Sequence, residues 1–313
     1  MLKKYTLKNN LLEVSILNLG GIIHEIKMPD REGKIDNIIH GFKNIEDYQR
    51  NDAYFGALIG RTAGRIAKGQ YAINGTDYSM ETVDRGNGLH GGLNGFDKKY
   101  FECHQEENSL TLVYHSVDGE EGFPGNLDVT VVYTLKEDEL IIEYKGVSDQ
   151  DTLLNMTNHS YFNLEPSKSI LEMKLELESD YLVEIDESSI PTGRFLDVSN
   201  TPFDFRSGKL IGKDINDEHI QLQRANGYDH PWIIKGNLQL SSANGRKMIV
   251  TSDQPCVVLY SYNFPILDHK KYAGLAIEFQ AEPDGIHHNA FSSSILKKGE
   301  TYTQKTVYKF MVE

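Results

Sequence analysis

Residues 127–147 read LDVTVVYTLKEDELIIEYKGV, and this stretch decides the fold class. Leu127 to Leu135 and Leu140 to Val147 are rich in Val, Ile and Tyr, which favour β-strands. The polar Lys136-Glu137-Asp138-Glu139 between them predicts a hairpin loop. Further along, Leu171 to Glu178 alternates apolar and charged residues, as expected of a strand with one buried face. The sequence therefore predicts antiparallel strands.

Two Asn-Gly pairs predict tight hairpin turns, because both residues tolerate the positive φ of a type I′ turn. Asn74-Gly75 and Asn244-Gly245 each lie between two strand-like runs. Helical patterns are scarce, and only residues 214–224 are expected to hold a short helix. No Pro/Gly/Ser-rich linker divides the chain. We therefore expect one all-β domain over residues 1–313, a large antiparallel β-sandwich or open barrel.

The composition excludes several classes of function. The 313 residues include 46 Asp and Glu against 32 Lys and Arg, a formal net charge of −14. Nucleic acids and anionic membranes attract basic surfaces, so neither is an expected partner. The sequence shows no signal peptide, and no apolar run approaches the length of about 18 residues that a membrane helix needs. Cys103 and Cys256 are too few for a disulfide framework or a four-cysteine zinc site. We expect a cytoplasmic protein.

Five polar segments fit neither ordinary strands nor ordinary turns. They are GRTAGRI at 60–66, NGLHGG at 87–92, TNHSYFNL at 157–164, GYDHPW at 227–232 and IEFQ at 277–280. A chain of this size buries enough surface to fold without a metal or disulfide. Unusual polar clusters are therefore better explained by function than by stability.

Two histidines and a glutamate are candidates for acid–base chemistry. His90 precedes two glycines, which let the backbone approach a ligand closely, and imidazole titrates near neutral pH. His159 lies in a dense polar set. Glu278 interrupts an apolar strand, where burial would raise its pKa and make it a better base. Each residue also has a plainer interpretation. His90 could be a histidine in a turn, His159 a buried histidine with its hydrogen bonds satisfied, and Glu278 an outward-facing residue of a strand.

Sugar binding is suggested by Asp229, whose neighbours include Tyr228 and Trp232. A carboxylate can hold hydroxyl groups and an aromatic ring can stack on a sugar, although a turn aspartate is the plainer interpretation. Arg61 and Arg65 could equally be surface charges. The chain has no dinucleotide fingerprint, P-loop, nucleophile elbow or zinc-protease motif. The adjacent His287-His288 would point to opposite faces of an extended segment, so we expect no metal there.

Taken in order, these segments resemble the aldose 1-epimerase (galactose mutarotase) family. The resemblance covers nearly the whole chain and includes GFDK at 95–98 and DGEEGFPGNL at 118–127. It implies a large antiparallel β-sandwich of the galactose-mutarotase type. It also implies an isomerase that interconverts the α and β anomers of free hexoses such as galactose and glucose. The implied partner is a small-molecule aldose, with no cofactor and no metal, and a homodimer is one option for assembly.

The resemblance also implies roles for individual residues. Glu278 matches the general base and His159 the general acid, with His90 as a third catalytic residue. The residues that match sugar-binding positions are Arg65, Asp229 and Phe264. The chain departs from the family pattern at Gly64, where Asn is usual, at Gly88, where Ser is usual, and in a shorter segment before Glu278. These departures leave the preferred aldose open.

Three other functions compete with this hypothesis. A sugar-phosphate or other-saccharide 1-epimerase of the same fold would want additional basic residues, for which Arg61, Arg194 and Arg206 are available. A glycoside hydrolase could use Asp229 and Glu278 as its carboxylate pair, but would leave both histidines without roles. A non-catalytic sugar-binding protein should have lost the acid or the base, and this chain retains both.

Overall fold

Antiparallel strands dominate the computed structural model, which describes residues 1–313. The largest sheet contains both strand-like runs of the 127–147 stretch. Its nine strands, in spatial order, are β11 (Glu102–Gln105), β12 (Ser109–Ser116), β13 (Leu127–Lys136), β14 (Glu139–Ser148), β28 (Thr301–Val312), β24 (Arg246–Ser252), β23 (Leu238–Ser241), β18 (Lys174–Leu177) and β21 (Lys209–Leu210).

Two further sheets complete the main body. The seven-stranded sheet has the order β20 (Pro191–Asp197), β19 (Tyr181–Ile185), β22 (Asp229–Ile233), β25 (Cys256–Tyr260), β26 (Leu275–Gln280), β17 (Tyr161–Phe162) and β5 (Ile39–His40). The four-stranded sheet is β1 (Lys4–Lys8), β2 (Glu13–Leu17), β3 (Ile23–Pro29) and β4 (Ile35–Asn37). The remaining pairs are β10 (Gly88–Leu89) with β7 (Arg65–Ile66), β15 (Thr152–Leu153) with β27 (Ile295–Leu296), β16 (Thr157–Asn158) with β6 (Leu58–Ile59), and β8 (Gln70–Ile73) with β9 (Thr76–Ser79).

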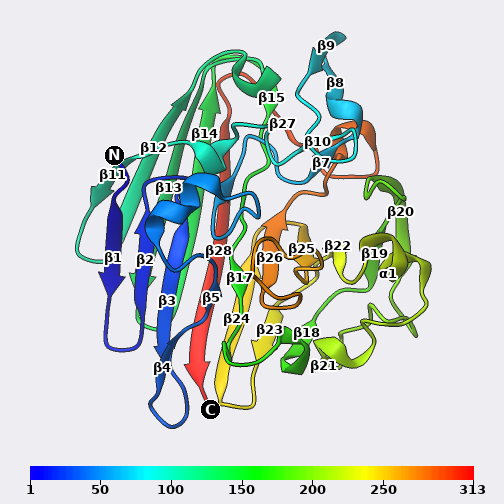
Figure 1. The fold of residues 1–313 in the computed structure, drawn as a ribbon. Coiled ribbons are helices and arrows are strands. Elements are labelled where there is room, and N and C mark those ends of the chain that lie inside the picture. Colours follow the sequence, from blue (N-terminus) through cyan, green and yellow to red (C-terminus); the bar gives the residue numbers. More distant parts are fainter.

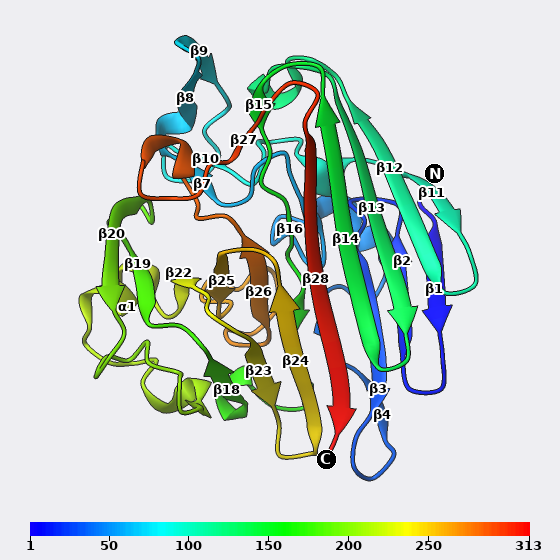
Figure 2. The same cartoon turned by 180° about the vertical axis from the view of Figure 1, so that it is seen from behind.

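The sheets form two layers around one main core. Figure 1 shows β1–β4 and the seven-stranded sheet on the near side of the long strands β12, β13, β14 and β28, and Figure 2 shows these long strands from behind. A cluster of 51 buried apolar residues draws on strands of all three sheets. The alternating inner faces of facing sheets produce such a core. The predicted all-β sandwich is confirmed.

The predicted turns also form. β13 and β14 pair from Leu127↔Ser148 to Lys136↔Glu139, so the connection is a two-residue turn, shorter than the predicted loop. Asn74-Gly75 joins β8 to β9, and both residues have positive φ, 52° and 80°. Asn244-Gly245 lies in the turn between β23 and β24. Each turn occurs where the chain reverses between paired strands.

The prediction of one continuous strand over Leu171–Glu178 is wrong. The strand is confined to Lys174–Leu177, and Ile170–Glu172 forms a 3-10 helix capped by the Ser169 side chain. Ile170 and Met173 are both buried, and the three-residue spacing of a 3-10 turn brings such positions to one side. Packing of these two side chains therefore outweighs the alternation at the start of the run.

Helices are short. Residues 214–224 were expected to hold one, and α1 spans Ile220–Ala225. The 3-10 helices are Ile45–Arg50, Ala67–Gly69, Phe96–Lys98, Glu120–Gly122, Ile170–Glu172, Ile211–Lys213 and Gly285–His287. None of the helices is both long enough and apolar enough to span a bilayer.

Arg61 is neither the surface charge that was its plainer interpretation nor a free phosphate-binding group. Its side chain is 2% exposed, and its guanidinium donates hydrogen bonds to oxygens of Ser116, Val117, Pro124, Gly125 and Thr152. Burial lowers the pKa of Arg61 to about 10. Arg61 thus stabilises the packing of these neighbouring segments through buried hydrogen bonds, and its guanidinium is not available to bind a phosphate.

Candidate active site

The strand β26 separates the core of the sandwich from the candidate site. Leu275, Ile277 and Phe279 belong to the main core, whereas Glu278 and Gln280 point to the other face of the sheet. All six residues of β26 are buried, because loops cover this second face. Glu278 is only 2% exposed and lines a pocket of about 210 Å³.

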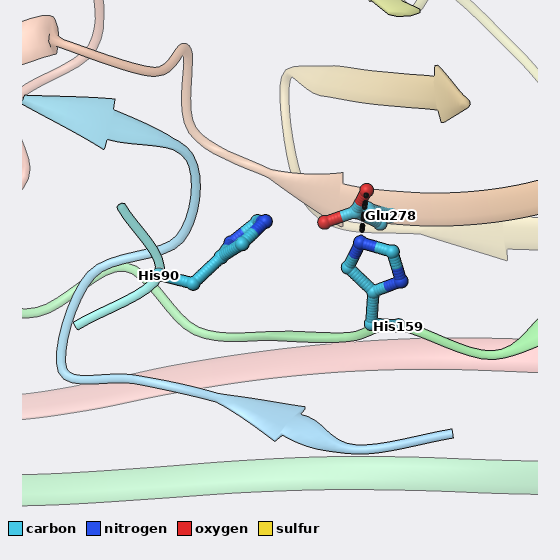
Figure 3. A group of neighbouring side chains, drawn as sticks. All are labelled: His90, His159 and Glu278. Atoms are coloured by element: carbon cyan, nitrogen blue, oxygen red, sulfur yellow. Dashed lines mark ion pairs between the residues drawn. The ribbon is translucent and has the colours of Figure 1, made fainter. Parts of the chain in front are cut away.

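His159 approaches Glu278 from the neighbouring connection between β16 and β17 (Figure 3). Its Nε2 lies 3.4 Å from Oε1 of Glu278, and the imidazole is 4% exposed. The backbone of His159 is held on both sides: its N–H donates to the carbonyl of Ala57 and its carbonyl accepts from Gly56. A buried carboxyl group and a buried imidazole therefore face each other at the pocket wall.

His90 completes a group of three side chains, with its ring directed toward the other two in Figure 3. One ring nitrogen of His90, one of His159 and a carboxylate oxygen of Glu278 all lie within 4.8 Å of one another. His90 has φ = +49°, and its backbone N–H donates to the carbonyl of Gly64. In return, Nδ1 of His90 accepts a hydrogen bond from the Gly64 N–H at 3.2 Å. This reciprocal pairing fixes the ring.

Arg65 and Asp229 lie together at a second wall of the same pocket. Nη2 of Arg65 is 4.0 Å from Oδ2 of Asp229, and Nε of Arg65 donates to Oδ2 of Asp84 at 2.8 Å. The two-stranded pair of β7 with β10 places Arg65 opposite Leu89, next to His90. Asp229 begins β22 and pairs with Tyr260 of β25. The sheet register thus brings together residues that are 164 positions apart.

Phe264 lies at the rim. It lines the pocket and is 49% exposed, and the guanidinium of Arg85 is 5.9 Å from the centre of its ring. All six residues predicted for the site therefore line one pocket: His90, His159, Glu278, Arg65, Asp229 and Phe264.

Burial acts in opposite directions on the acid and on the imidazoles, because it disfavours the charged form of each. It raises the pKa of Glu278 well above its usual value, the charge of Asp229 adds to this, and Arg65 opposes it. Burial lowers the pKa of His159 to about 4. The pKa of His90 lies well below its usual value, through burial first and then through His159 and Arg65. Such displaced values are typical of acid–base sites.

Comparison with known proteins agrees with this arrangement. A family model described as aldose 1-epimerase matches residues 3–309. The chain belongs to the aldose 1-epimerase family. It is 37% identical to the human protein named galactose mutarotase, over 99% of this chain and 94% of that one. It is 34% identical to the aldose 1-epimerase of Escherichia coli strain K12, over 98% and 95%.

Solved structures of the family have the same fold. An aldose epimerase homologue from C. elegans superposes with a TM-score of 0.94 at 29% identity, covering 100% of this chain and 99% of that one. Galactose 1-epimerase from Lactobacillus acidophilus gives 0.89 at 29% identity, covering 100% and 98%. Membership of the aldose 1-epimerase family makes the protein an isomerase that interconverts the anomers of aldoses.

The three central side chains are of the kinds that bind zinc, since two histidines and a glutamate are common zinc ligands. A neutral imidazole carries its proton on one nitrogen only. Nδ1 of His90 accepts from the Gly64 N–H, so Nε2 carries the proton and points into the pocket as a donor. A protonated nitrogen cannot bind a metal. The donor set of this epimerase therefore fits a hydrogen-bonded sugar better than a metal ion.

The His287-His288 segment is not extended throughout, because His287 is the last residue of the short helix Gly285–His287 and His288 follows it as the C-cap. Nδ1 of His287 lies 2.6 Å from Oδ1 of Asp284, and Nε2 of His288 lies 3.5 Å from Oδ2. The two rings thus share a carboxylate partner, which adjacent residues of a strand could not do.

Two pocket residues were not singled out from the sequence. Gln280 is fully buried, and neither polar atom of its amide has a hydrogen-bond partner. Tyr54 packs its ring against both histidines and has φ = +57°. Gln280 ends the IEFQ segment, and its spacing of two residues from Glu278 is a sequence signal that both side chains lie on the same face of the strand. Nothing in the residues around Tyr54 indicates its backbone conformation.

Proposed function

We propose that the protein accelerates the mutarotation of free hexoses such as galactose and glucose, with Glu278 and His159 as the reacting acid–base pair. The observation that carries the proposal is the 3.4 Å approach of two buried, oppositely shifted groups at the wall of a pocket. Positioned acid–base groups each contribute about 10²–10⁴-fold to a rate. No covalent intermediate is required.

Ring opening follows from the positions of the two groups. Glu278 takes the proton of the C1 hydroxyl while His159 gives a proton to the ring oxygen, and the C1–O5 bond breaks. The aldehyde then turns about C1–C2. On closure, Glu278 returns its proton to the C1 oxygen, and His159 takes the proton of the C5 hydroxyl as O5 attacks the other face.

The pair must therefore hold one proton in total, on His159 before opening and on Glu278 afterwards. Burial favours the uncharged arrangement, with the proton on Glu278, because it raises the pKa of Glu278 and lowers that of His159. In the proposed steps, this arrangement is present while the sugar is in its open-chain form. Ring closure therefore starts from the protonation state that burial favours, whereas ring opening starts from the disfavoured state, with the proton on His159.

The other predicted residues have binding roles in this proposal. His90 donates from Nε2 to the ring oxygen as charge changes there. Arg65 and Asp229 hold hydroxyl groups away from C1, so that C1 is free to turn. Phe264 offers a half-exposed ring at the rim on which an apolar sugar face can lie.

The charges of the pocket favour a free sugar over a sugar phosphate. Its acidic lining residues are Asp52, Asp84, Asp229 and Glu278. Against these stand Arg65, which already contacts two of the carboxylates, and Arg85. The other candidate arginines are occupied as well: Arg194 by Glu184 and Arg206 by Asp180 and Asp204. A phosphate would meet an excess of negative charge.

Polarimetry tests the proposed substrate. Freshly dissolved α-D-galactose, α-D-glucose and α-D-glucose 6-phosphate are followed to their final rotations with and without the protein, after subtraction of the spontaneous rate. We expect acceleration with the two free sugars and at least about tenfold lower kcat/KM with the phosphate, which corresponds to 1.4 kcal/mol. Equal or better turnover of the phosphate would reject the free-sugar assignment.

We also propose that residues 1–313 act as one domain in the cytoplasm. All site groups come from a single chain, so a homodimer would carry two separate sites. Sedimentation of the active protein at several concentrations tests the assembly. Specific activity should not change with the proportion of dimer.

A further inference from the structure

The loop of residues 51–57 lies against the active site, and the proposal above gives its Tyr54 side chain no role. Tyr54 in this loop has φ = +57°, a left-handed conformation that is rare for a bulky residue. The buried amide of Asn51 holds the turn closed, because it donates to the carbonyl of Phe55 at 3.0 Å and accepts from the N–H of Phe55 at 2.9 Å. Backbone strain of this kind persists only where surrounding contacts enforce it.

The strained position places the ring of Tyr54 against both catalytic imidazoles. Its centre is 4.7 Å from that of His90 at an interplanar angle of 63°, and 5.8 Å from that of His159 at 34°. The two imidazoles are 5.2 Å apart and nearly perpendicular, at 87°. Tyr54 thus contacts the imidazole rings of His90 and His159 and restricts their rotation.

The same loop also holds the backbone of His159. Gly56 donates to the His159 carbonyl at 3.1 Å, and the His159 N–H donates to Ala57 at 2.8 Å. The hydroxyl of Tyr161, whose ring packs on His159, donates to Ala53 at 3.1 Å. One short segment therefore fixes the backbone of His159 and, through Tyr54, the direction of its side chain.

We propose that Tyr54 is a positioning residue that sets the ring orientations of His90 and His159 relative to Glu278. The inference deepens the proposed function and rests on it. The aromatic ring carries the effect, and the hydroxyl does not. A misplacement of about 1 Å at a reacting group can cost about 10²-fold in rate, so loss of the ring should lower kcat much more than it changes KM.

Three variants distinguish the effect of the Tyr54 ring from the effect of its backbone conformation. Tyr54→Asn removes the ring and keeps a residue that tolerates positive φ. Tyr54→Phe keeps the ring, and Tyr54→His keeps a smaller ring while tolerating the same backbone. We expect kcat to fall about 30- to 100-fold in Tyr54→Asn, to fall less in Tyr54→His, and to stay within about threefold of wild type in Tyr54→Phe. KM should change less than about threefold in all three.

The pH profile supplies a readout that a purely structural role would not move. Without the ring, water reaches both imidazoles and their pKa values rise toward the usual value, so the acid limb of activity moves to higher pH in Tyr54→Asn and stays in place in Tyr54→Phe. The groups that face these residues are the same in every variant: Glu278, Arg65, Tyr161, Asp52, Asp84, Asp97 and Lys98.

Imidazole NMR signals of His90 and His159 test the positioning independently of turnover. They should shift in Tyr54→Asn and remain near wild type in Tyr54→Phe. Unchanged imidazole signals and kcat in a folded Tyr54→Asn protein would overturn the inference, as would equal losses in Tyr54→Phe. If Tyr54→Asn does not fold, Tyr54→His decides by the same signals and rates. A wild-type protein without mutarotase activity would reject the proposed function, while the signals would still decide the role of Tyr54.

Discussion

Nε2 of His159 lies 3.4 Å from Oε1 of Glu278, with both side chains almost fully removed from water. The two residues come from a loop and from the adjacent strand β26, so the contact depends on the sheet and on the loop that holds His159. Because the pair is buried, the position of its single shared proton decides whether it can catalyse ring opening or ring closure. The pH dependence of activity follows from the number of protons that His159 and Glu278 hold together.

The rate should depend on pH as a bell. Below about pH 4 both groups are protonated, because the pKa of His159 is lowered to about 4 by burial while that of Glu278 is raised. Above the raised pKa of Glu278 the pair holds no proton. Activity therefore requires the window between, and kcat/KM for α-D-galactose should fall at both ends. A rate that keeps rising with pH well into the alkaline range would contradict the one-proton account.

Replacement of Arg61 by methionine should destabilise the fold severely. The guanidinium is 2% exposed and satisfies buried carbonyl groups that would be left without donors. We expect a loss of about 3–5 kcal/mol in the free energy of unfolding, measured by urea denaturation. Arg206→Met is the matched control, because that side chain is 37% exposed and water screens its ion pairs, so this variant should lose much less stability than Arg61→Met. Similar losses in the two variants would refute the structural role of Arg61.

Gln280→Met should have the opposite effect on stability. Both amide atoms of Gln280 are buried without partners, and each such group costs about 1–3 kcal/mol. Methionine fills similar space without the amide, so the urea midpoint should rise. Gln304→Met is the control: its Nε2 donates to the carbonyl of Phe279 at 3.0 Å, so that variant should be less stable than wild type. A lower midpoint in Gln280→Met would show that the amide has a partner such as an ordered water.

Much of the fold was accessible from the sequence because strand patterns and turns are local. Residues 127–147 predicted β13 and β14, and Asn74-Gly75 predicted the turn between β8 and β9. The alternation over residues 171–178 predicted a strand that starts too early. Alternation cannot reveal that Ile170 and Met173 pack on one side of a 3-10 turn. Local patterns fail where tertiary packing decides the conformation.

The site was predictable in part for a similar reason. Glu278 attracts notice because a carboxyl group inside an apolar strand is costly unless it has a use. The sequence could not show that Arg61 is buried while Arg65 reaches the pocket, because both lie in one glycine-rich loop. Nor could it reveal Tyr54, whose importance comes from a left-handed backbone that Asn51 enforces. These properties depend on contacts between distant segments.

The most direct test of the central claim is polarimetry with Glu278→Gln, His159→Gln and the double variant, on α-D-galactose and α-D-glucose. If the two residues transfer protons as a unit, each single change should lower kcat by about 10²–10⁴-fold, and the double change should cost little more than the worse single one. All three proteins should remain folded, as judged by circular dichroism. Near-wild-type turnover by folded Glu278→Gln, or losses that multiply in the double variant, would contradict a shared-proton pair.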